Sequence, residues 1–203
     1  VHVNFSDLAA MGAKPRYALL SLTLPRIDES WVTRFADGLW HALDEFDVEL
    51  VGGNTTRGPL AIAMTAFGDV PPEGALLRSG AKVGDEVWVS GALGDAGWAL
   101  YCMIGDIKAE ATADQIARYE CPTARVALGL ALRGIATSCI DISDGLLSEA
   151  QHLASASNVC IDIQLPAIPT GLATQLPAPE LAARAQHCLL ATGDAYELLF
   201  TAP

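Results

Sequence analysis

The sequence predicts a two-lobed protein of the α/β or α+β class. Strand-like apolar segments alternate with segments of helical periodicity, and there is no internal sequence repeat. A turn-rich stretch without periodicity, Pro71–Gly84, separates two such groups. The chain has 203 residues, 51% of them hydrophobic, which is enough for one large core or two small ones. We therefore place one lobe at residues 1–72, a linker at 73–84 and a second lobe at 85–203.

The first lobe is expected to contain a strand, a helix and two further strands. Asp28 is expected to cap an amphipathic helix at Glu29–Phe46, in which apolar residues recur at near-helical spacing. Gly52-Gly53 is expected to end the second strand, and Pro71-Pro72 closes the third. The predicted strands are Tyr17–Leu24, Val48–Val51 and Leu60–Val70.

The second lobe is expected to alternate strands with helices. The predicted strands are Glu86–Ser90, Cys139–Ile142 and Val159–Gln164, with a strand-like end at Tyr196–Pro203. The predicted helices are Asp95–Gly105, Ala124–Gly134 and Leu146–Ser157. Four prolines in Leu165–Pro179 predict a loop or a sheet edge. The chain opens at Val1 directly in a structured segment and ends inside a strand-like one, so we expect a piece of a longer protein.

Composition excludes several function classes. Twelve basic residues against 24 acidic ones give a formal charge of −12, which argues against nucleic acid or an anionic membrane as partner. No apolar run is long enough to span a bilayer, and no signal peptide is visible. The five cysteines show no C-x-x-C spacing and are expected to be reduced, small, buried residues. These features predict a cytoplasmic protein.

The strongest local motif is Asp141-Ile142-Ser143-Asp144-Gly145. A turn from strand to helix would aim two carboxylates and a hydroxyl at one point, close to the amides of a helix start. Such a carboxylate pair suits Mg²⁺, which also takes phosphate and water as ligands. The alternative is an ordinary helix N-cap, and both can hold together.

Four other segments carry polar groups, and each has a plain structural alternative. Gly52–Pro59 is a glycine- and hydroxyl-rich segment that predicts either a phosphate contact or a hairpin turn. Asn4, Ser6 and Asp7 are typical of a capped helix start, and Gly193–Glu197 is typical of a surface turn. Arg78 lies in the linker, where it is expected to be solvated. No P-loop, protein-kinase motif set or G-x-G-x-x-G is present.

The order of these motifs is more specific than any one of them. SDLAAMGA, GGNTTRGP, LLRSGAKVGDEVWVSGALGDA, IDISDGL and GDAYELLF occur in this order along almost the whole chain. In this order they resemble the thiamine-monophosphate kinase family, within the superfamily of aminoimidazole ribonucleotide synthetase. The resemblance implies a two-lobed fold of that type. The N-terminal lobe would form a β-barrel with a second subunit, and the C-terminal lobe would be a mixed sheet with helices.

The resemblance also implies a reaction and its residues. A homodimer would use ATP and several Mg²⁺ ions to phosphorylate thiamine monophosphate by in-line transfer, without a protein nucleophile. The implied metal ligands are Asp7, Asn54, Asp141 and Asp144. The implied ATP contacts are Gly53, Asn54, Arg78 and Ser143, and Asp194 would lie near the thiamine substrate.

The chain departs from the family pattern in two places, and we expect both family ends to lie outside it. Asn54 stands where the family usually has Asp, and Ala195 where it usually has a second acidic residue. We therefore expect weaker metal binding, altered substrate binding, and little activity from this polypeptide alone. Two alternatives stay open: a sister enzyme such as aminoimidazole ribonucleotide synthetase, selenophosphate synthetase or the hydrogenase-maturation type, and a degenerate nucleotide-binding dimer.

Overall fold

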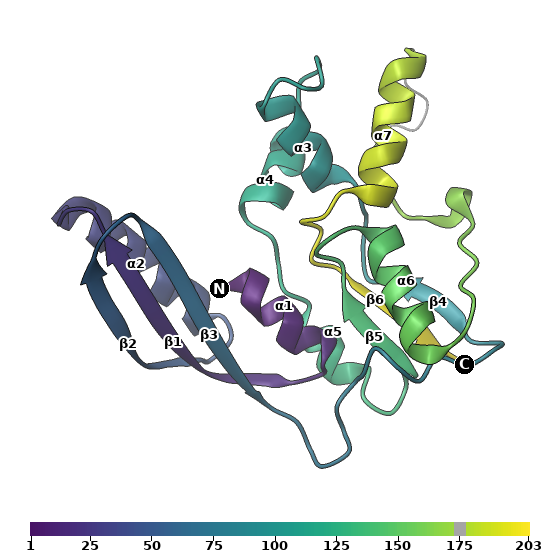
Figure 1. The fold of residues 1–203 in the computed structure, drawn as a ribbon, viewed down its shortest axis with the longest axis horizontal. Helices are drawn as coiled ribbons and strands as arrows, with labels where there is room; N and C mark the ends of the chain where they lie inside the picture. The colour runs from purple at the N-terminus through teal and green to yellow at the C-terminus, as the bar shows by residue number, and fades with distance from the viewer. Residues whose placement is uncertain (173–177) are drawn as a thin grey trace.

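The computed structural model describes residues 1–172 and 178–203. Two groups of elements lie side by side along the long axis, each built on its own three-stranded sheet (Figure 1). Residues 70–85 connect the groups through turns without a helix or strand. The mixed α/β content predicted from the alternating segments is confirmed, whereas the exact limits of the lobes stay a prediction.

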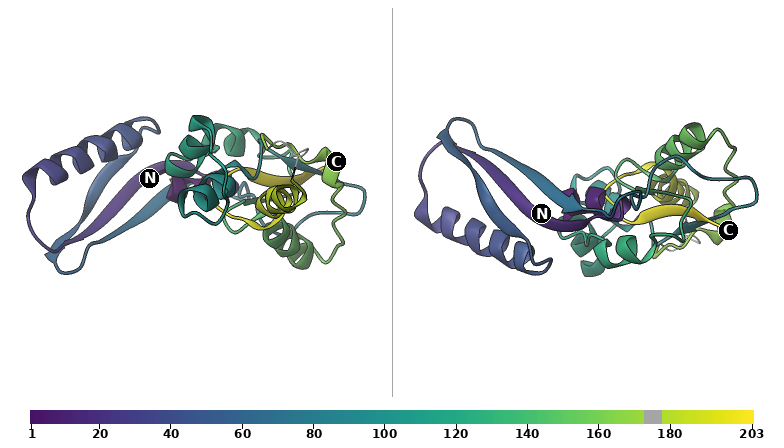
Figure 2. Two further views of the ribbon diagram at one scale, coloured as in Figure 1. Left: turned by 90° about the horizontal axis from the view of Figure 1, so that it is seen from above. Right: turned by 90° about the horizontal axis from the view of Figure 1, so that it is seen from below.

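The first sheet has the order β2-β1-β3 and one covering helix. Strand β1 (Lys14–Leu24) pairs in parallel with β2 (Glu49–Arg57) and antiparallel with β3 (Ala61–Asp69). Helix α2 (Glu29–Asp44) begins as predicted, because the Asp28 carboxylate accepts a hydrogen bond from the Trp31 amide at 3.0 Å. Figure 2 shows α2 against one face of this sheet, and the other face stays uncovered.

Strand β2 corrects the prediction for the glycine-rich segment. Gly52-Gly53 was expected to end the strand, but the strand continues through both glycines and Asn54 to Arg57. A Cβ atom on Gly53 would lie 1.8 Å from the Leu20 carbonyl oxygen, and the backbone φ of Gly53 is +148°. Glycine is therefore required here by close approach of β1, and not by a turn.

The second sheet has the order β4-β6-β5. Strands β4 (Glu86–Val89) and β5 (Ser138–Asp141) both pair antiparallel with the central β6 (Leu198–Ala202). Helices α6 (Leu146–Ser157) and α7 (Pro179–Ala191) pack together, and α3 (Asp95–Met103) contacts α7. The remaining helices are α4 (Ala113–Glu120), α5 (Val126–Ala131) and the 3-10 turn η1 (Leu165–Ala167).

Several predictions for this lobe need correction. Residues 159–164 form no strand, although their apolar side chains alternate with exposed ones as a strand would require. Helices α4 and α7 had not been predicted, and α5 is shorter than Ala124–Gly134. The loop predicted for Leu165–Pro179 holds the 3-10 turn, and its residues 173–177 lie outside the described residues.

Helix α1 (His2–Ala10) joins the two groups through one hydrophobic core. Phe5 is fully buried in a cluster with Leu43 of α2, and the same cluster includes Val126 of α5 and Cys139 of β5. The helix begins at His2, so Asp7 lies inside it and does not cap its start as the simpler interpretation expected. Because α1 packs against α5 and β5, Asp7 lies next to the second lobe.

The remaining composition-based predictions have mixed outcomes. All five cysteines are free, as expected, but Cys121 and Cys160 are exposed, whereas small buried residues were predicted. Within residues 1–172 and 178–203, no helix combines the length and hydrophobicity needed to cross a membrane.

Candidate active site

The site begins where β5 ends and turns into α6. Asp141 is the last residue of β5, and its side chain is only 5% exposed. Gly145 occupies the N-cap position of α6 with φ +113°, and no side chain caps the helix. Instead, the buried Glu149 accepts a hydrogen bond from the Asp144 amide at 3.3 Å. The N-cap interpretation of the motif is therefore wrong, and the exposed Asp144 carboxylate does not serve the helix.

A second turn packs directly against this one. The Asp194 amide donates to the Ser143 carbonyl oxygen at 2.9 Å, and the Tyr196 amide donates to the Ile142 carbonyl oxygen at 2.9 Å. A Cβ atom on Gly193 would lie 1.9 Å from the Ser143 carbonyl oxygen, so only glycine allows this approach. The turn 193–197 is thus fixed against the Asp141–Asp144 turn.

The backbone of the second turn is unusual. Asp194 (φ +61°) and Tyr196 (φ +50°) both adopt left-handed conformations, which are rare for a bulky residue such as tyrosine. The Tyr196 hydroxyl donates to Asp194 Oδ1 at 3.1 Å. Strained backbone of this kind clusters at functional sites, because the surrounding structure must hold it in place. The segment 193–197 was predicted to be an ordinary surface turn. The structure shows that it is a turn held in a strained conformation against the Asp141–Asp144 turn.

Helix α1 supplies the third part of the site. Ser6 is fully buried, and its hydroxyl donates to Asp141 Oδ2 at 2.7 Å. The next residue, Asp7, is exposed, and its charge acts on both Asp141 and Tyr196. The clustering of Asp7 with Asp141 agrees with the motif order noted in the sequence.

The electrostatics show that negative charge accumulates here. Burial raises the pKa of Asp141, the Ser6 hydrogen bond opposes that shift, and the negative charge of Asp7 raises the pKa further. Burial, then the charge and hydrogen bond of Asp194, raise the pKa of Tyr196 to about 12, with smaller contributions from Asp141 and Asp7. The anionic groups destabilise one another, which is the condition under which a bound cation is favourable.

Arg78 is the cation that the structure places near these carboxylates. The Cys139 amide donates to the Leu77 carbonyl oxygen at 2.9 Å, so this part of the connection lies alongside β5. The charge of Arg78 lowers the pKa of Asp141, although it is the weakest of the influences on that group. Arg78 is exposed, and across the described ranges no lysine or arginine forms a salt bridge with Asp141.

Gly53 and Asn54 are not part of this cluster. They lie on β2, the outer strand of the first sheet, with β1 and β3 between them and the second lobe (Figure 1). Asn54 is exposed and is paired in register with Ser21. The structure therefore brings together Asp7, Arg78, Asp141, Ser143, Asp144 and Asp194, and leaves these two residues apart.

Three participants were not among the predicted site residues: Ser6, which had been considered only as part of a capped helix start, Tyr196, which had been considered only as part of a surface turn, and Glu149. Each is adjacent to, or within a few residues of, a side chain that had been singled out. The sequence shows these neighbours, but only the folded chain shows that the Ser6 hydroxyl points at Asp141 or that Glu149 points back at the Asp144 amide.

A buried ion-pair cluster lies behind the second turn. Glu197 is only 1% exposed, and Arg125 contacts both of its carboxylate oxygens, at 2.7 Å and 2.5 Å. Arg118 adds a bond at 3.1 Å, and the Ser90 hydroxyl donates at 2.5 Å. This cluster anchors the chain immediately after Tyr196.

The donor set fits Mg²⁺ only in part. Among the described residues, no group of three or more His, Cys, Asp or Glu side chains is arranged to hold a metal ion by itself. Magnesium is commonly bound through one or two carboxylates, with phosphate oxygens and waters as the remaining ligands. Asp141 with Asp7 or Asp144 fits that mode, so a cation here would require a phosphate ligand.

Comparison with known proteins identifies the family. The family described as AIR synthase related protein, N-terminal domain, matches residues 1–70. Thiamine-monophosphate kinase from Salmonella typhimurium is 41% identical over 99% of the chain, and the chain spans 62% of the length of that relative. The Aquifex aeolicus relative of the same name is 35% identical over the whole chain, which covers 67% of it. The chain belongs to the thiamine-monophosphate kinase family.

Solved structures agree with this assignment. A crystal structure of thiamine-monophosphate kinase from Stenotrophomonas maltophilia matches with a TM-score of 0.90 and 43% identity, covering 99% of this chain and 65% of that one. A structure described as AaThiL complexed with AMPPCP and TMP matches with a TM-score of 0.84 and 34% identity, covering 99% and 66%. The fold implied by the resemblance is confirmed, while the dimeric barrel stays a prediction.

Proposed function

We propose that this chain forms the reaction centre of an enzyme that transfers the γ-phosphate of ATP to thiamine monophosphate, giving thiamine diphosphate. The observation that supports this proposal most directly is the Asp7–Asp141 cluster, in which the buried Asp141 carboxylate is close enough to Asp7 of a distant segment for the charge of Asp7 to act on it. Family membership supports the substrates, because the related AaThiL structure contains AMPPCP and TMP.

The residues present suit a transfer that needs positioning and charge neutralisation. In-line phosphoryl transfer leaves little covalent chemistry to the protein. Bound Mg²⁺ would neutralise the phosphate oxygens, and Asp141 with either Asp7 or Asp144 would hold it. Ser6 keeps the Asp141 carboxylate oriented by its hydrogen bond, so the ligand geometry is set before substrate arrives.

The nucleotide and the acceptor would contact different sides of the cluster. We propose that Arg78 contacts ATP phosphates through its charge and that Ser143 contacts them from its position in the turn. Asp194, held by the Tyr196 hydroxyl, would lie at the thiamine end. At position 195 alanine leaves the turn with one carboxylate fewer than the family pattern, so we expect weaker binding of the acceptor.

We also propose a homodimer formed through the uncovered face of the first sheet. Tyr17 and Phe67 are paired neighbours on β1 and β3 and are 46% and 45% exposed. Asn54 and Thr56 are paired with the odd-numbered β1 residues Ser21 and Thr23, so they lie on the same face as Tyr17. An exposed apolar face on a sheet that is covered on its other side favours a protein partner.

A second copy would give Gly53 and Asn54 a role. Within one chain they lie away from Asp141, so we propose that they contact nucleotide and metal bound to the partner copy. Mixing inactive Asp141→Asn and Asn54→Ala proteins should then restore part of the activity, because one of the two sites in a mixed dimer keeps both residues. Activity that stays at the level of the separate variants would contradict this arrangement.

The direct test is a full-length assay with ATP, Mg²⁺ and thiamine monophosphate, following thiamine diphosphate by chromatography. Formation of thiamine diphosphate supports the proposal. Nucleotide binding without product would favour the degenerate dimer, and turnover of another phosphoryl acceptor or of formylglycinamidine ribonucleotide would favour a sister enzyme. We place the reaction in the cytoplasm, which the five free cysteines support.

A further inference from the structure

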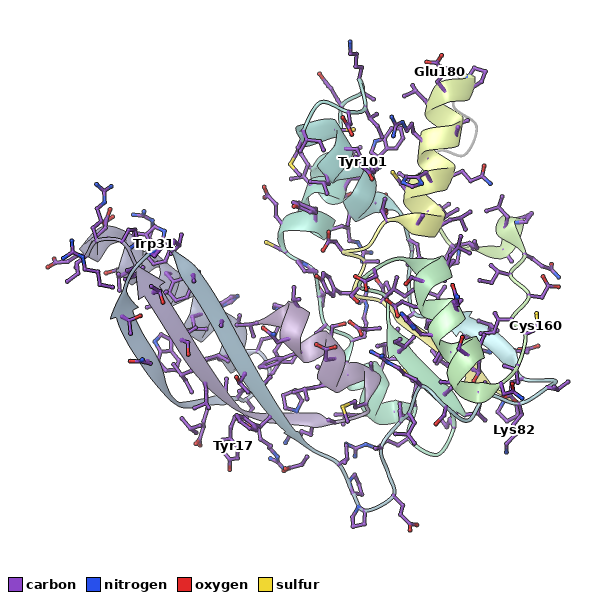
Figure 3. All side chains as sticks on the ribbon, in the orientation of Figure 1. Tyr17, Trp31, Lys82, Tyr101, Cys160 and Glu180 are labelled. Atoms are coloured by element: carbon purple, nitrogen blue, oxygen red, sulfur yellow. The ribbon has the colours of Figure 1, made fainter. Side chains whose placement is uncertain are left out.

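The segment that carries Arg78 is held in place by one side chain of α6. Ser157 is the last residue of this helix. Its side-chain oxygen accepts hydrogen bonds from the amides of Gly80 and Ala81, each at 3.1 Å, and its hydroxyl donates to the Arg78 carbonyl oxygen at 3.4 Å. A serine hydroxyl has one proton and two lone pairs, so the segment takes up its whole capacity. Figure 3 labels Lys82, the residue after this segment, on the side of the molecule where α6 ends.

Two further contacts hold the same segment against β5 and the residue before it. The Cys139 amide donates to the Leu77 carbonyl oxygen at 2.9 Å. A Cβ atom on Gly80 would lie 2.3 Å from the Thr137 carbonyl oxygen, and the backbone φ of Gly80 is +125°, so glycine is required here. The segment is therefore bonded to α6 on one side and lies along β5 on the other.

The Arg78 side chain is left available, although its main chain is fixed. The guanidinium group is exposed and, within residues 1–172 and 178–203, takes part in no salt bridge. Its charge nevertheless acts on Asp141, the last residue of β5. A guanidinium group without a carboxylate partner can offer its N–H groups to phosphate oxygens.

Helix α6 connects this attachment to the proposed metal site. It follows the Asp141–Asp144 turn directly and ends at Ser157, so one helix of 12 residues joins the two. A helix of that length is a spacer of about 18 Å, and α6 also packs against β5. The turn at its start and the segment at its end therefore keep a fixed spacing.

We propose that Ser157 is a positioning residue for nucleotide binding, which holds residues 78–81 so that the Arg78 guanidinium stays within reach of phosphates bound at Asp141. This inference rests on the proposed function and deepens it, because it assigns a role to a side chain outside the candidate site. Without the Ser157 hydroxyl, the segment would have to become ordered each time a phosphate binds, which lowers the affinity. The alternative is that Ser157 stabilises the connection between the lobes and has no effect on the nucleotide.

The test compares Ser157→Ala with Ser157→Thr, which keeps the hydroxyl, in the full-length protein. Binding of the non-hydrolysable ATP analogue AMPPCP with Mg²⁺ is measured by calorimetry. We expect Ser157→Ala to raise the Kd about 5-fold and Ser157→Thr to stay within about 2-fold of the unaltered protein. The KM for thiamine monophosphate should change by less than about 2-fold in both. Ser155→Ala, at an exposed position of the same helix, is the matched control, and thermal melts check the fold of every variant.

A double substitution shows whether Ser157 acts through Arg78. Arg78→Ala should weaken AMPPCP binding about 10-fold or more, because a charged hydrogen bond to phosphate is lost. Adding Ser157→Ala to Arg78→Ala should cause no further loss, since no guanidinium group is left to position. A role confined to the connection would instead lower the melting temperature and leave the affinity for AMPPCP unchanged.

Amide hydrogen exchange tests the attachment itself, without nucleotide and without any need for kinase activity. The Gly80 and Ala81 amides lose their acceptor in Ser157→Ala. They should therefore exchange about 10-fold or more faster than in Ser155→Ala.

Any of three results refutes the inference. Ser157→Ala binds AMPPCP as tightly as Ser155→Ala; the losses from the two single substitutions multiply in the double variant; or Ser157→Thr binds as weakly as Ser157→Ala although its Gly80 and Ala81 amides still exchange slowly. An unaltered protein that does not bind AMPPCP refutes the proposed function and this inference with it. Normal binding and turnover in Ser157→Ala refute this inference alone.

Discussion

Two buried carboxylates, Asp141 and Glu197, lie on neighbouring turns of the second lobe and have opposite surroundings. Burial alone would raise the pKa of each. For Glu197 the hydrogen bonds from Arg125 and Ser90, with the charges of Arg125 and Arg118, overcome that shift and hold the pKa below its usual range. For Asp141 burial prevails over the single Ser6 hydrogen bond, and the charge of Asp7 adds to it, so the pKa is raised.

The difference separates a structural carboxylate, Glu197, from Asp141, the carboxylate that we propose to be functional. Glu197 is already neutralised by two guanidinium groups, so it has no capacity for a further cation and serves to anchor the chain after Tyr196. The Asp141 carboxylate accepts a hydrogen bond from the neutral Ser6 hydroxyl and lies near other carboxylates. Its negative charge is therefore not neutralised by the protein and can bind a cation. Each prediction below tests one side of this contrast.

The largest effect is expected from Asp141→Asn. The substitution keeps the shape and the Ser6 hydrogen bond but removes the charge, so kcat should fall by about 10²–10³-fold and the Mg²⁺ dependence should weaken sharply. Folding should be unimpaired, because a buried and unpaired charge is lost. The measurements are a Mg²⁺ titration of kcat and a thermal melt. Asp37→Asn on the exposed side of α2 is the control, and near-normal titration of Asp141→Asn would remove Asp141 from the site.

Glu197→Gln should act mainly on stability. It leaves two arginines without their carboxylate, and because both are partly exposed we expect a loss of about 2–3 kcal/mol in the free energy of unfolding. A depressed folded-state pKa means that this stabilisation is complete above the unfolded value of about 4.3 and is lost as pH falls through the folded value.

The pH dependence gives the discriminating readout for that variant. Denaturant melts should show a constant difference between the unaltered chain and Glu197→Gln from about pH 6 to 8, shrinking below about pH 4.5. A difference that does not change with pH would mean that the carboxylate contributes packing and no charge pairing.

Gly193→Ala tests how tightly the two turns are joined. The added Cβ would lie 1.9 Å from the Ser143 carbonyl oxygen, so the turns must separate, at a cost of about 1–3 kcal/mol. Gly38→Ala, in α2, is the matched control: an added Cβ there would meet no atom within 4 Å, and the substitution should stabilise the chain by up to about 1 kcal/mol. Denaturant melts of both variants provide the measurement. Equal stabilities would show that the turns are not in fixed contact.

The smallest effect is expected from Tyr196→Phe, which removes one hydroxyl. Loss of its hydrogen bond to Asp194 should cost about 1 kcal/mol, seen as a rise of about 5-fold in KM for thiamine monophosphate with kcat and KM for ATP little changed. Tyr119→Phe in α4 is the control for loss of a phenol elsewhere. If KM for ATP rises in step, Asp194 does not lie at the thiamine end.

Helix α6 shows where local sequence was sufficient. It runs from Leu146 to Ser157 as predicted, because Gly145 with positive φ precedes it and Asn158 in a left-handed conformation ends it. Strand β2 shows the opposite case. Gly53, which indicates a turn in the sequence, is needed because a Cβ atom there would collide with the main chain of β1, and that neighbour is set by the fold and not by local sequence.

The candidate site, like the fold, could be predicted only in part from local sequence. Local spacing around Asp141 could not distinguish a helix cap from a metal ligand, and only the order of motifs along the chain placed Asp7 beside it. The direction of a side chain on a helix depends on which face packs inward, so the hydrogen bond from Ser6 to Asp141 was not predicted, although Ser6 had been noted beside Asp7. The strand predicted for residues 159–164 is absent: their burial alternates as in a strand, but a strand also needs a paired neighbour.

The core around Phe5 has a consequence for motion. Because the same apolar cluster contains residues of α2, α5 and β5, the two sheets cannot swing apart about residues 73–84 without exposing it to water. If the chain binds nucleotide as proposed, we expect opening and closing around it to come from loops at the rim, and the two halves should melt together in one calorimetric peak.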